Sequence, residues 1–264
     1  MLTFDNVRFQ YDSEDFSIID HLSFTVDAGE FVCVIGPSGC GKSTIFRLVN
    51  KLLTPAEGTV LVNGTPIEKQ KNYCGYMPQQ DLLFPWRTVK ENLMLPMEIQ
   101  GGISKVEMEQ RADQALESVG LKDWGKKSPK ELSGGMRQRA AFARTVLTGS
   151  DLLLLDEPFS ALDYLTRLSM REWLLEQWER EKKTVLFITH DVEEAVFLSS
   201  RILVVENMPI THLKSIEVPA EYPRTREELM RPEIVKLKED LIDMLRRETV
   251  GEIRKRQEMP IFRH

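Results

Sequence analysis

Short apolar runs near the N-terminus alternate with polar turns. Residues 3–9 switch between apolar and polar positions, residues 21–26 follow, and Phe31–Ile35 is an uninterrupted apolar run. Alternation is typical of a half-buried strand, and an uninterrupted run between turns is typical of a strand buried on both faces. Apolar positions, Leu52 among them, then recur at helical spacing in residues 43–53. The pattern predicts strands first and a helix after the third of them.

The second half of the chain shows a larger alternation. Residues 152–156, 184–189 and 201–206 are short apolar runs, and helical patterns occupy residues 162–183 and 192–199 between them. Strands that alternate with helices favour a parallel sheet covered by helices. The predicted fold class is therefore α/β, with parallel strands in its core.

Between these regions the sequence becomes charged and helix-rich. Residues 105–119 place apolar positions, Val106 among them, along one side of a helix. We interpret residues 87–150 as a helical subdomain inserted into an α/β domain that spans residues 1–210. Residues 211–264 are predicted to form a charged linker and an amphipathic helix, whose apolar stripe contains Ile234, Leu237, Leu241, Met244 and Leu245.

Composition and charge restrict the partners. The chain has 264 residues, a net charge of −6 and a pI near 5.5. These values argue against nucleic acid as a partner, because proteins that bind a duplex neutralise its phosphates with basic side chains. The three cysteines, Cys33, Cys40 and Cys74, lack metal-ligand spacing and fit a reduced compartment. No apolar run approaches the ~20 residues that span a bilayer, so we expect membrane contact only through a partner or a surface.

A glycine-rich loop follows Phe31–Ile35. Gly36–Ser43 matches the pattern G-x-x-x-x-G-K-[ST] between a predicted strand and a predicted helix. Such a loop points backbone N–H groups at phosphate oxygens, and the helix N-terminus adds its positive dipole end. Lys42 supplies a positive charge for the β and γ phosphates of a nucleotide, and the Ser43 hydroxyl can bind Mg²⁺. The predicted nucleotide-binding residues are Gly36, Pro37, Ser38, Gly39, Cys40, Gly41, Lys42, Ser43 and Thr44.

Two adjacent carboxylates end the apolar run at residues 152–156. Asp156, at the carboxyl end of a buried strand, is placed to reach Mg²⁺, and Glu157 is placed to polarise an attacking water. Taken alone, this segment could equally be an ordinary strand with acidic residues at its end. The phosphate loop favours the catalytic interpretation, although it does not distinguish kinases, GTPases, helicases and transport ATPases.

A serine and two glycines open a further predicted helix. Residues 132–138 read LSGGMRQ, and a helix N-terminus of this kind can bind an anion, although it can also be an ordinary cap. The stretch resembles the signature of ABC ATPases, in which Ser133, Gly134 and Gly135 would contact ATP bound to a partner subunit. The resemblance covers residues 1–210. It implies a P-loop NTPase core with a parallel sheet, an antiparallel N-terminal β subdomain and an inserted helical subdomain.

A second stretch, YMPQQDLLFPW at residues 76–86, also resembles the family. On chemistry alone, either Gln79 or Gln80 could link Mg²⁺ to the transporter contact, and spacing to Pro85 in similar proteins favours Gln79. By composition, residues 82–86 could simply be core. In ABC transporters, however, the matching region lines the groove that receives a helix of the membrane subunit. The resemblance therefore implies that a transmembrane permease docks on the Gln79–Trp86 region.

Three single residues complete the resemblance. Tyr11 is similar to the aromatic residue that stacks on adenine, Asp163 belongs to a loop that communicates across the dimer, and His190 is similar to the histidine that contacts the γ-phosphate. Each has an ordinary alternative when taken alone. Tyr11 could be a packed aromatic residue, Asp163 a helix cap, and His190 a structural residue at a strand end.

The family resemblance also implies partners. The run LLFPWR and the tail that contains Pro223 and Arg224 are similar to ATPase subunits of nitrate, sulfonate and taurine importers, although residues 207–210 replace the usual glycine turn. Such a subunit pairs with a second ATPase subunit, here expected to be another copy of this chain. The pair binds ATP and Mg²⁺ at the cytoplasmic face of the membrane. A solute-binding protein acts on it indirectly, through the permease.

Two other classes compete with this interpretation. ABC ATPases of DNA repair, chromosome structure or translation usually carry coiled coils, paired nucleotide domains or basic surfaces, and none is visible in this acidic sequence. A solitary P-loop kinase or GTPase would leave residues 132–138 unexplained, and the sequence lacks the Asn-Lys-x-Asp motif that reads guanine.

Overall fold

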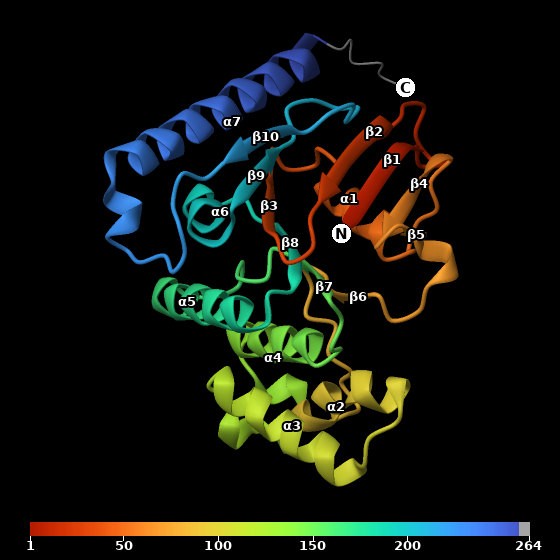
Figure 1. The fold of residues 1–264 in the computed structure, drawn as a ribbon, viewed down its shortest axis with the longest axis vertical. Coiled ribbons are helices and arrows are strands. Elements are labelled where there is room, and N and C mark those ends of the chain that lie inside the picture. The colour runs from red at the N-terminus through yellow and green to blue at the C-terminus, as the bar shows by residue number, and fades with distance from the viewer. Residues whose placement is uncertain (259–264) are drawn as a thin grey trace. The chain divides into compact units, whose positions relative to one another are not determined.

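The computed structural model describes residues 1–258, with side chains described up to Arg246. Two compact units divide the chain: the first combines Met1–Gly64 with Ile188–His264, and the second is Thr65–Phe187. Figure 1 shows the elements of both units. Each unit has its own strands and helices, and each is described separately below.

An antiparallel sheet begins the first unit. Strand β1 (Leu2–Phe9) pairs antiparallel with β2 (Ile19–Val26) on one side and with β4 (Glu57–Val62) on the other. Leu2, Phe4 and further apolar side chains of β1 are buried, as the alternating pattern predicts. The predicted antiparallel N-terminal β subdomain is confirmed for these strands.

Parallel pairing follows in the same unit. Strand β3 (Phe31–Ile35), buried at every position, pairs parallel with β9 (Arg201–Val204), and β9 pairs antiparallel with β10 (Lys214–Glu217). The strand predicted at residues 201–206 is two residues longer than β9, and the sequence analysis does not predict β10. Its residues are polar and mostly exposed, so no apolar pattern marks it.

The first unit also contains helices (Figure 1). They are α1 (Lys42–Val49), α6 (Val192–Leu198) and α7 (Pro232–Glu258), and α6 packs against both β3 and α7. The prediction that α1 continues to Leu53 is wrong. The helix ends at Val49, with Asn50 as its C-cap, and Leu52, assigned to its apolar face, is 65% exposed. For α7 the predicted stripe is confirmed at Ile234 and Leu241, which are fully buried. Residues 259–264 of the predicted C-terminal segment lie outside the described residues.

The second unit combines strands with a group of helices. Its strands β6 (Cys74–Met77), β7 (Leu152–Asp156) and β8 (Thr184–Ile188) follow the order β8-β7-β6, with β6 parallel to β7. Helix α5 (Tyr164–Glu181) joins β7 to β8, as the 3.6-residue pattern predicts. The unit begins with the short elements β5 (Thr65–Pro66) and η1 (Ile67–Lys69).

Three helices of this unit pack against one another. In the sequence they come between β6 and β7. They are α2 (Val89–Gln100), α3 (Lys105–Ser118) and α4 (Gly134–Val146). Thr88, Ser104 and Ser133 cap them, each accepting a hydrogen bond from a backbone N–H of the first turn. Val106 is 65% exposed, which corrects its assignment to the apolar side of α3. The boundaries of the predicted helical insertion stay a prediction.

A buried arginine ties the C-terminal segment to α6. Arg224 is 5% exposed, and its guanidinium donates to the carbonyls of Val196 at 2.7 Å and Ser199 at 2.6 Å. It also donates to Ala220 at 2.8 Å and lies 4.3 Å from the ring of Tyr222. The last carbonyls of a helix have no partner within it, and a cation there also complements the helix dipole. Burial lowers the pKa of Arg224, yet a guanidinium stays charged in proteins.

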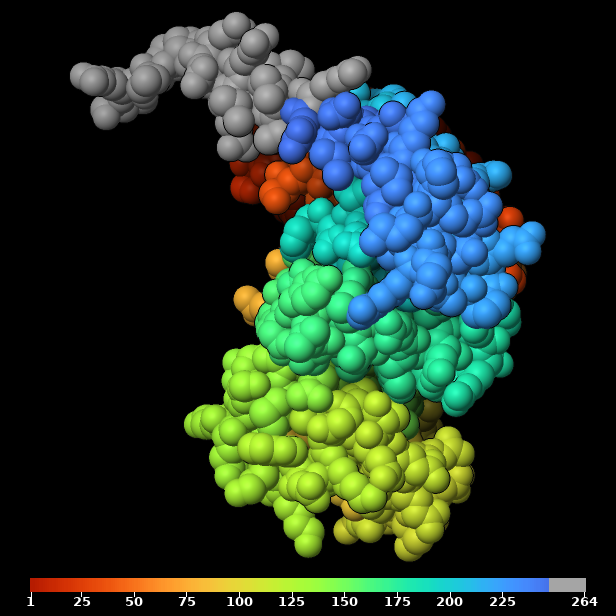
Figure 2. Space-filling model, turned by 90° about the vertical axis from the view of Figure 1, so that its left-hand side faces the viewer, coloured from red at the N-terminus to blue at the C-terminus, as the bar shows by residue number. Residues whose placement is uncertain are grey.

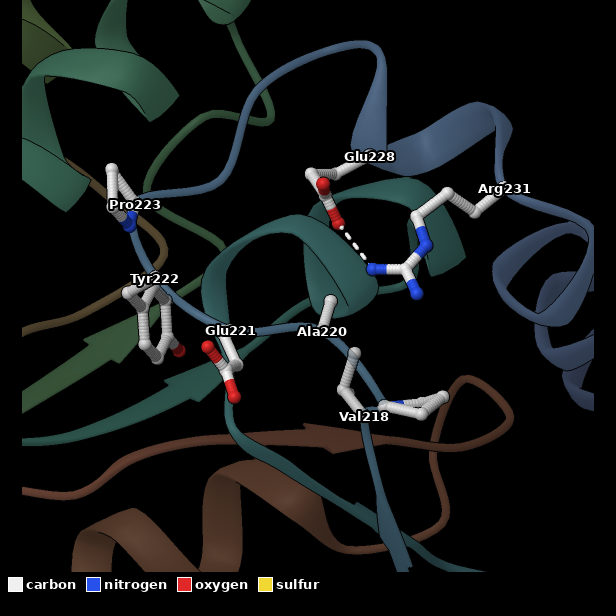
Figure 3. A pocket seen from close by; sticks show the side chains of 8 residues that line it. Val218, Ala220, Glu221, Tyr222, Pro223, Glu228 and Arg231 are labelled. Atoms are coloured by element: carbon white, nitrogen blue, oxygen red, sulfur yellow. Dashed lines mark hydrogen bonds and ion pairs between the residues drawn. The ribbon is translucent and has the colours of Figure 1, made fainter.

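The segment around this arginine forms an open pocket at the surface. Residues 218–223 line the pocket with Glu228 and Arg231, whose side chains form an ion pair at 2.9 Å (Figure 3). In the space-filling view, the blue C-terminal segment is a continuous part of the surface (Figure 2). Arg224 therefore anchors the segment that lines this pocket.

Arg224→Met should lower the free energy of unfolding by about 3 kcal/mol, because it leaves several buried carbonyls without a donor. Chemical denaturation measures the loss. Arg226→Met, a change at an exposed arginine, is the matched control and should stay within about 0.5 kcal/mol of the unchanged protein. Equal midpoints for the two variants would contradict the anchoring role.

Candidate functional site

The glycine-rich loop joins β3 to α1 in the first unit. Lys42 is 7% exposed, and its Nζ donates to the carbonyls of Gly36 at 2.8 Å and Pro37 at 2.6 Å. Gly41 precedes α1 with φ +96°, a left-handed conformation that costs glycine little. The loop therefore wraps around the ammonium group, and its curled backbone directly precedes a helix N-terminus. This is the strand–loop–helix arrangement that the sequence predicts.

Tyr11 lies against the same helix. Its hydroxyl is 3.2 Å from the Thr44 hydroxyl, and Arg47 donates to it at 3.3 Å. Its ring meets Phe9 edge to face, with the ring centroids 4.8 Å apart. The structure thus brings Tyr11 to the predicted nucleotide-binding residue Thr44, while its stacking on adenine stays a prediction.

Two adjacent carboxylates lie at the carboxyl end of β7 in the second unit. Asp156 is 4% exposed at the end of the strand, whereas Glu157 has a left-handed backbone, with φ +49°. The Nε2 of Gln79 donates to a carboxylate oxygen of Glu157 at 3.3 Å. Sequence alone left Gln79 and Gln80 as candidates, and Gln79 is the one whose amide reaches this carboxylate.

Helix α4 begins at the predicted serine-glycine stretch. Ser133 is its N-cap, and the hydroxyl accepts from the N–H of Met136 at 3.2 Å. Gly134 and Gly135 form the first helical positions, so N–H groups of the first turn point out of the helix end. The same helix also contacts the turn after β7, because Gln138 donates a hydrogen bond to the carbonyl of Glu157. Sequence analysis does not assign a role to Gln138.

The remaining predicted residues lie at helix starts. Asp163 caps α5 by accepting from the N–H of Thr166 at 3.0 Å, and hydrogen bonds from Thr166 lower the pKa of this carboxyl. The helix-cap alternative for Asp163 is therefore present in the structure. His190 is exposed between β8 and α6, and Asp191 caps α6 directly after it. His190 therefore lies directly before the N-terminus of α6 in the first unit.

The apolar run at residues 82–86 divides into buried and exposed parts. Leu83 is 8% exposed, whereas Leu82 and Trp86 are 58% and 76% exposed. Asn92, fully buried in α2, exchanges two hydrogen bonds with the backbone of Phe84 at 2.7 and 3.1 Å. The core alternative therefore holds for Leu83 only, and Trp86 stands on an anchored loop at the surface.

The predicted magnesium ligands are oxygen donors. Among the residues whose side chains the structure describes, no group of three or more His, Cys, Asp or Glu side chains could hold a metal ion alone. Mg²⁺ typically binds one or two carboxylates together with substrate phosphates and water, rather than a cage made only of protein. The donor types at Ser43, Gln79 and Asp156 fit that preference.

Comparisons with known proteins identify the family. The ABC transporter family profile matches residues 19–160, which include the phosphate loop and Glu157. The chain is 44% identical over 252 residues to the formylaminopyrimidine import ATP-binding protein ThiZ of Halalkalibacterium halodurans, covering 95% of this chain and 98% of that protein. This chain belongs to the ABC transporter family. This ABC ATPase is also 41% identical to the aliphatic sulfonates import ATP-binding protein SsuB of Bacillus cereus, covering 79% and 82% of the two chains.

Solved structures agree with the family. The ABC ATPase resembles the ATP-binding cassette MJ0796, solved as a dimer in a post-hydrolysis state with ADP and Pi, at a TM-score of 0.75 and 28% identity. The match covers 84% of this chain and all of that one. The predicted fold class is confirmed, and the chain is an ATP-binding and ATP-hydrolysing subunit. In the described part of the chain, we find no helix with the length and apolarity needed to cross a membrane.

Leu83→Ala should destabilise the ABC ATPase by about 2–4 kcal/mol, because it opens a cavity in packed surroundings. Trp86→Ala, three residues further on, should change stability by less than about 0.5 kcal/mol, since the indole is largely exposed. Thermal unfolding of both variants measures the contrast. Comparable losses would mean that Trp86 belongs to the core.

Proposed function

We propose that this ABC ATPase energises the uptake of a small organic solute through a membrane permease, as one of two identical subunits. The observation that carries the proposal is the carboxylate of Glu157, which directly follows the buried strand β7 and accepts a hydrogen bond from Gln79. A carboxylate held by a neutral amide stays available as a base for water. The relatives named as import ATP-binding proteins support the direction of transport.

The residues of each unit have separate roles in this proposal. Lys42 and the loop N–H groups bind the phosphates, Tyr11 stacks on adenine, and His190 stabilises charge on the γ-phosphate. Glu157 orients the attacking water. Ser43, Gln79 and Asp156 would hold Mg²⁺, which neutralises phosphate charge when it is bound.

A second copy of the chain would complete the nucleotide site. The N-terminus of α4, with Ser133, Gly134 and Gly135, offers N–H groups and a positive dipole end to a phosphate. We propose that it contacts the γ-phosphate of ATP bound to the partner copy, and that Asp163 lies at the contact between the copies. The dimeric state in which the similar cassette MJ0796 was solved supports this arrangement.

Glu157→Gln should reduce ATP hydrolysis by about 10²-fold or more while ATP binding persists, because the amide is a poor base for water. The ATP-loaded variant should accumulate as a dimer. Phosphate release and size-exclusion chromatography with and without ATP measure the two effects. Near-normal turnover by this variant would remove Glu157 from its proposed role.

The permease would dock on the loop that carries Trp86. This loop is held by Asn92 and by Arg144, whose guanidinium donates to the carbonyls of Leu82 at 2.9 Å and Asp81 at 3.0 Å. An exposed aromatic residue on an anchored loop suits an apolar helix from a partner, because little conformational entropy is lost on binding. Peripheral attachment at the cytoplasmic face follows from this docking.

The solute is inferred from the relatives. The match to ThiZ spans 252 residues and so includes the C-terminal segment, whereas the match to SsuB spans 209 residues. We therefore favour a formylaminopyrimidine-like solute, with an aliphatic sulfonate as the second candidate. The solute-binding protein and the permease would select it.

Trp86→Ala should abolish co-purification with the co-expressed permease while ATP binding stays unchanged. In proteoliposomes that contain the unchanged complex, the binding protein loaded with a formylaminopyrimidine should stimulate ATP hydrolysis more than the empty protein does. Stimulation only with an aliphatic sulfonate would favour the second candidate. Normal assembly of the Trp86→Ala complex would contradict docking at this loop.

A further inference from the structure

Gln138 is a buried amide in the second turn of α4. It is 4% exposed, and its Nε2 donates to the carbonyl oxygen of Glu157 at 3.2 Å and to the hydroxyl of Ser160 at 3.1 Å. Its Oε1 accepts from the N–H of Ala161 at 2.8 Å. An amide side chain offers two N–H donors and one carbonyl oxygen, so each kind of group is used.

The contacts of Gln138 enclose one turn of backbone. Glu157 and Ala161 lie at its two ends, and within the turn the N–H of Ser160 donates to the carbonyl of Glu157 at 3.2 Å. Phe159, 1% exposed, packs against Phe142 of α4, with the ring centroids 6.3 Å apart. The turn is therefore attached to α4 by polar and apolar contacts together.

The conformation of Glu157 requires such support. Its φ of +49° lies in the left-handed region, which a residue with a Cβ enters only at a cost in free energy. Such a conformation persists where the surroundings determine it, and it is frequent at functional sites. Here the carbonyl of Glu157 is bound by Gln138 and its carboxylate by Gln79, so both ends of the residue are held.

The first turn of α4 also touches this segment. A Cβ placed on Gly135 would lie 3.3 Å from Cδ2 of Leu162 and 3.4 Å from the carbonyl oxygen of Ala161. The helix end that carries Ser133 is therefore in close contact with the backbone that leads back to Glu157. A displacement of α4 would be transmitted to this turn by direct contact.

We infer that Gln138 is a positioning residue that holds the carboxylate of Glu157 in its reactive orientation. Through it, the helix that engages one ATP sets the geometry of the carboxylate that acts on the other ATP of the dimer. The inference rests on the proposed role of Glu157. It predicts that Gln138 affects the rate of hydrolysis and not the binding of ATP.

The test compares Gln138→Leu and Gln138→Glu with the unchanged protein. Gln138→Leu removes all three contacts, and Gln138→Glu keeps the acceptor for Ala161 but places a carboxylate oxygen against the carbonyl of Glu157. Both should lower kcat by about 10- to 10²-fold, because small misplacements of a catalytic group cost rates of this size. The Kd for ATP should change by less than about twofold. Gln110→Glu, the same chemical change at an exposed position of α3, should leave both constants unchanged.

A double variant separates positioning from a general loss of structure. If Gln138 acts through Glu157, then Gln138→Leu added to Glu157→Gln should not reduce the residual rate further, because the two losses are not independent. If the two substitutions instead lower the rate by the product of their separate effects, the inference is wrong. An unchanged kcat in both Gln138→Leu and Gln138→Glu would also overturn it. If Gln138→Leu fails to fold, Gln138→Glu decides the outcome alone. An active Glu157→Gln would instead contradict the proposed function, so the two failures are distinguishable.

Discussion

The segment that follows β7 in the second unit depends on one constraint, the left-handed backbone at Glu157. A strand buried at every position delivers Asp156 and Glu157 to its carboxyl end, but two successive residues of a strand point to opposite sides. The change of φ to +49° redirects Glu157 away from the strand course. In this conformation the amide of Gln79 donates a hydrogen bond to its carboxylate, and the amide of Gln138 donates one to its carbonyl oxygen.

Helix α4 connects this constraint to the rest of the unit. Its N-terminus carries the serine-glycine cap, its interior face carries Gln138, and Arg137 donates to the carboxylate of Asp81 at 2.9 Å. Arg144, in the last turn of the helix, donates to the carbonyls of Asp81 and Leu82, and burial lowers the pKa of its guanidinium. One rigid helix thus contacts the turn after β7 and the loop that exposes Trp86. A partner that binds either loop would act on the same element.

Local pattern was enough to predict much of this protein. Phe31–Ile35 and Leu152–Asp156 are strands with the predicted bounds, because apolar runs bounded by turns have few alternatives in a packed α/β core. The order strand, glycine loop, helix at Gly36–Ser43 was likewise predicted, since the backbone conformation is encoded by neighbouring glycines. A strand made mostly of polar residues cannot be predicted in this way. Lys214–Glu217 pairs with β9 as strand β10, although its sequence has no apolar pattern.

By itself, then, the sequence determined the fold class, the family and the types of residue available for chemistry. Only the tertiary structure decided that Gln79 reaches Glu157, that Leu83 is buried while Trp86 is exposed, and that Gln138 holds the turn after β7. The physical reason is that these outcomes depend on contacts between residues far apart in the chain. A pattern of period 2 or 3.6 reports the local backbone and its buried face, and it carries no information on which distant group a polar side chain meets.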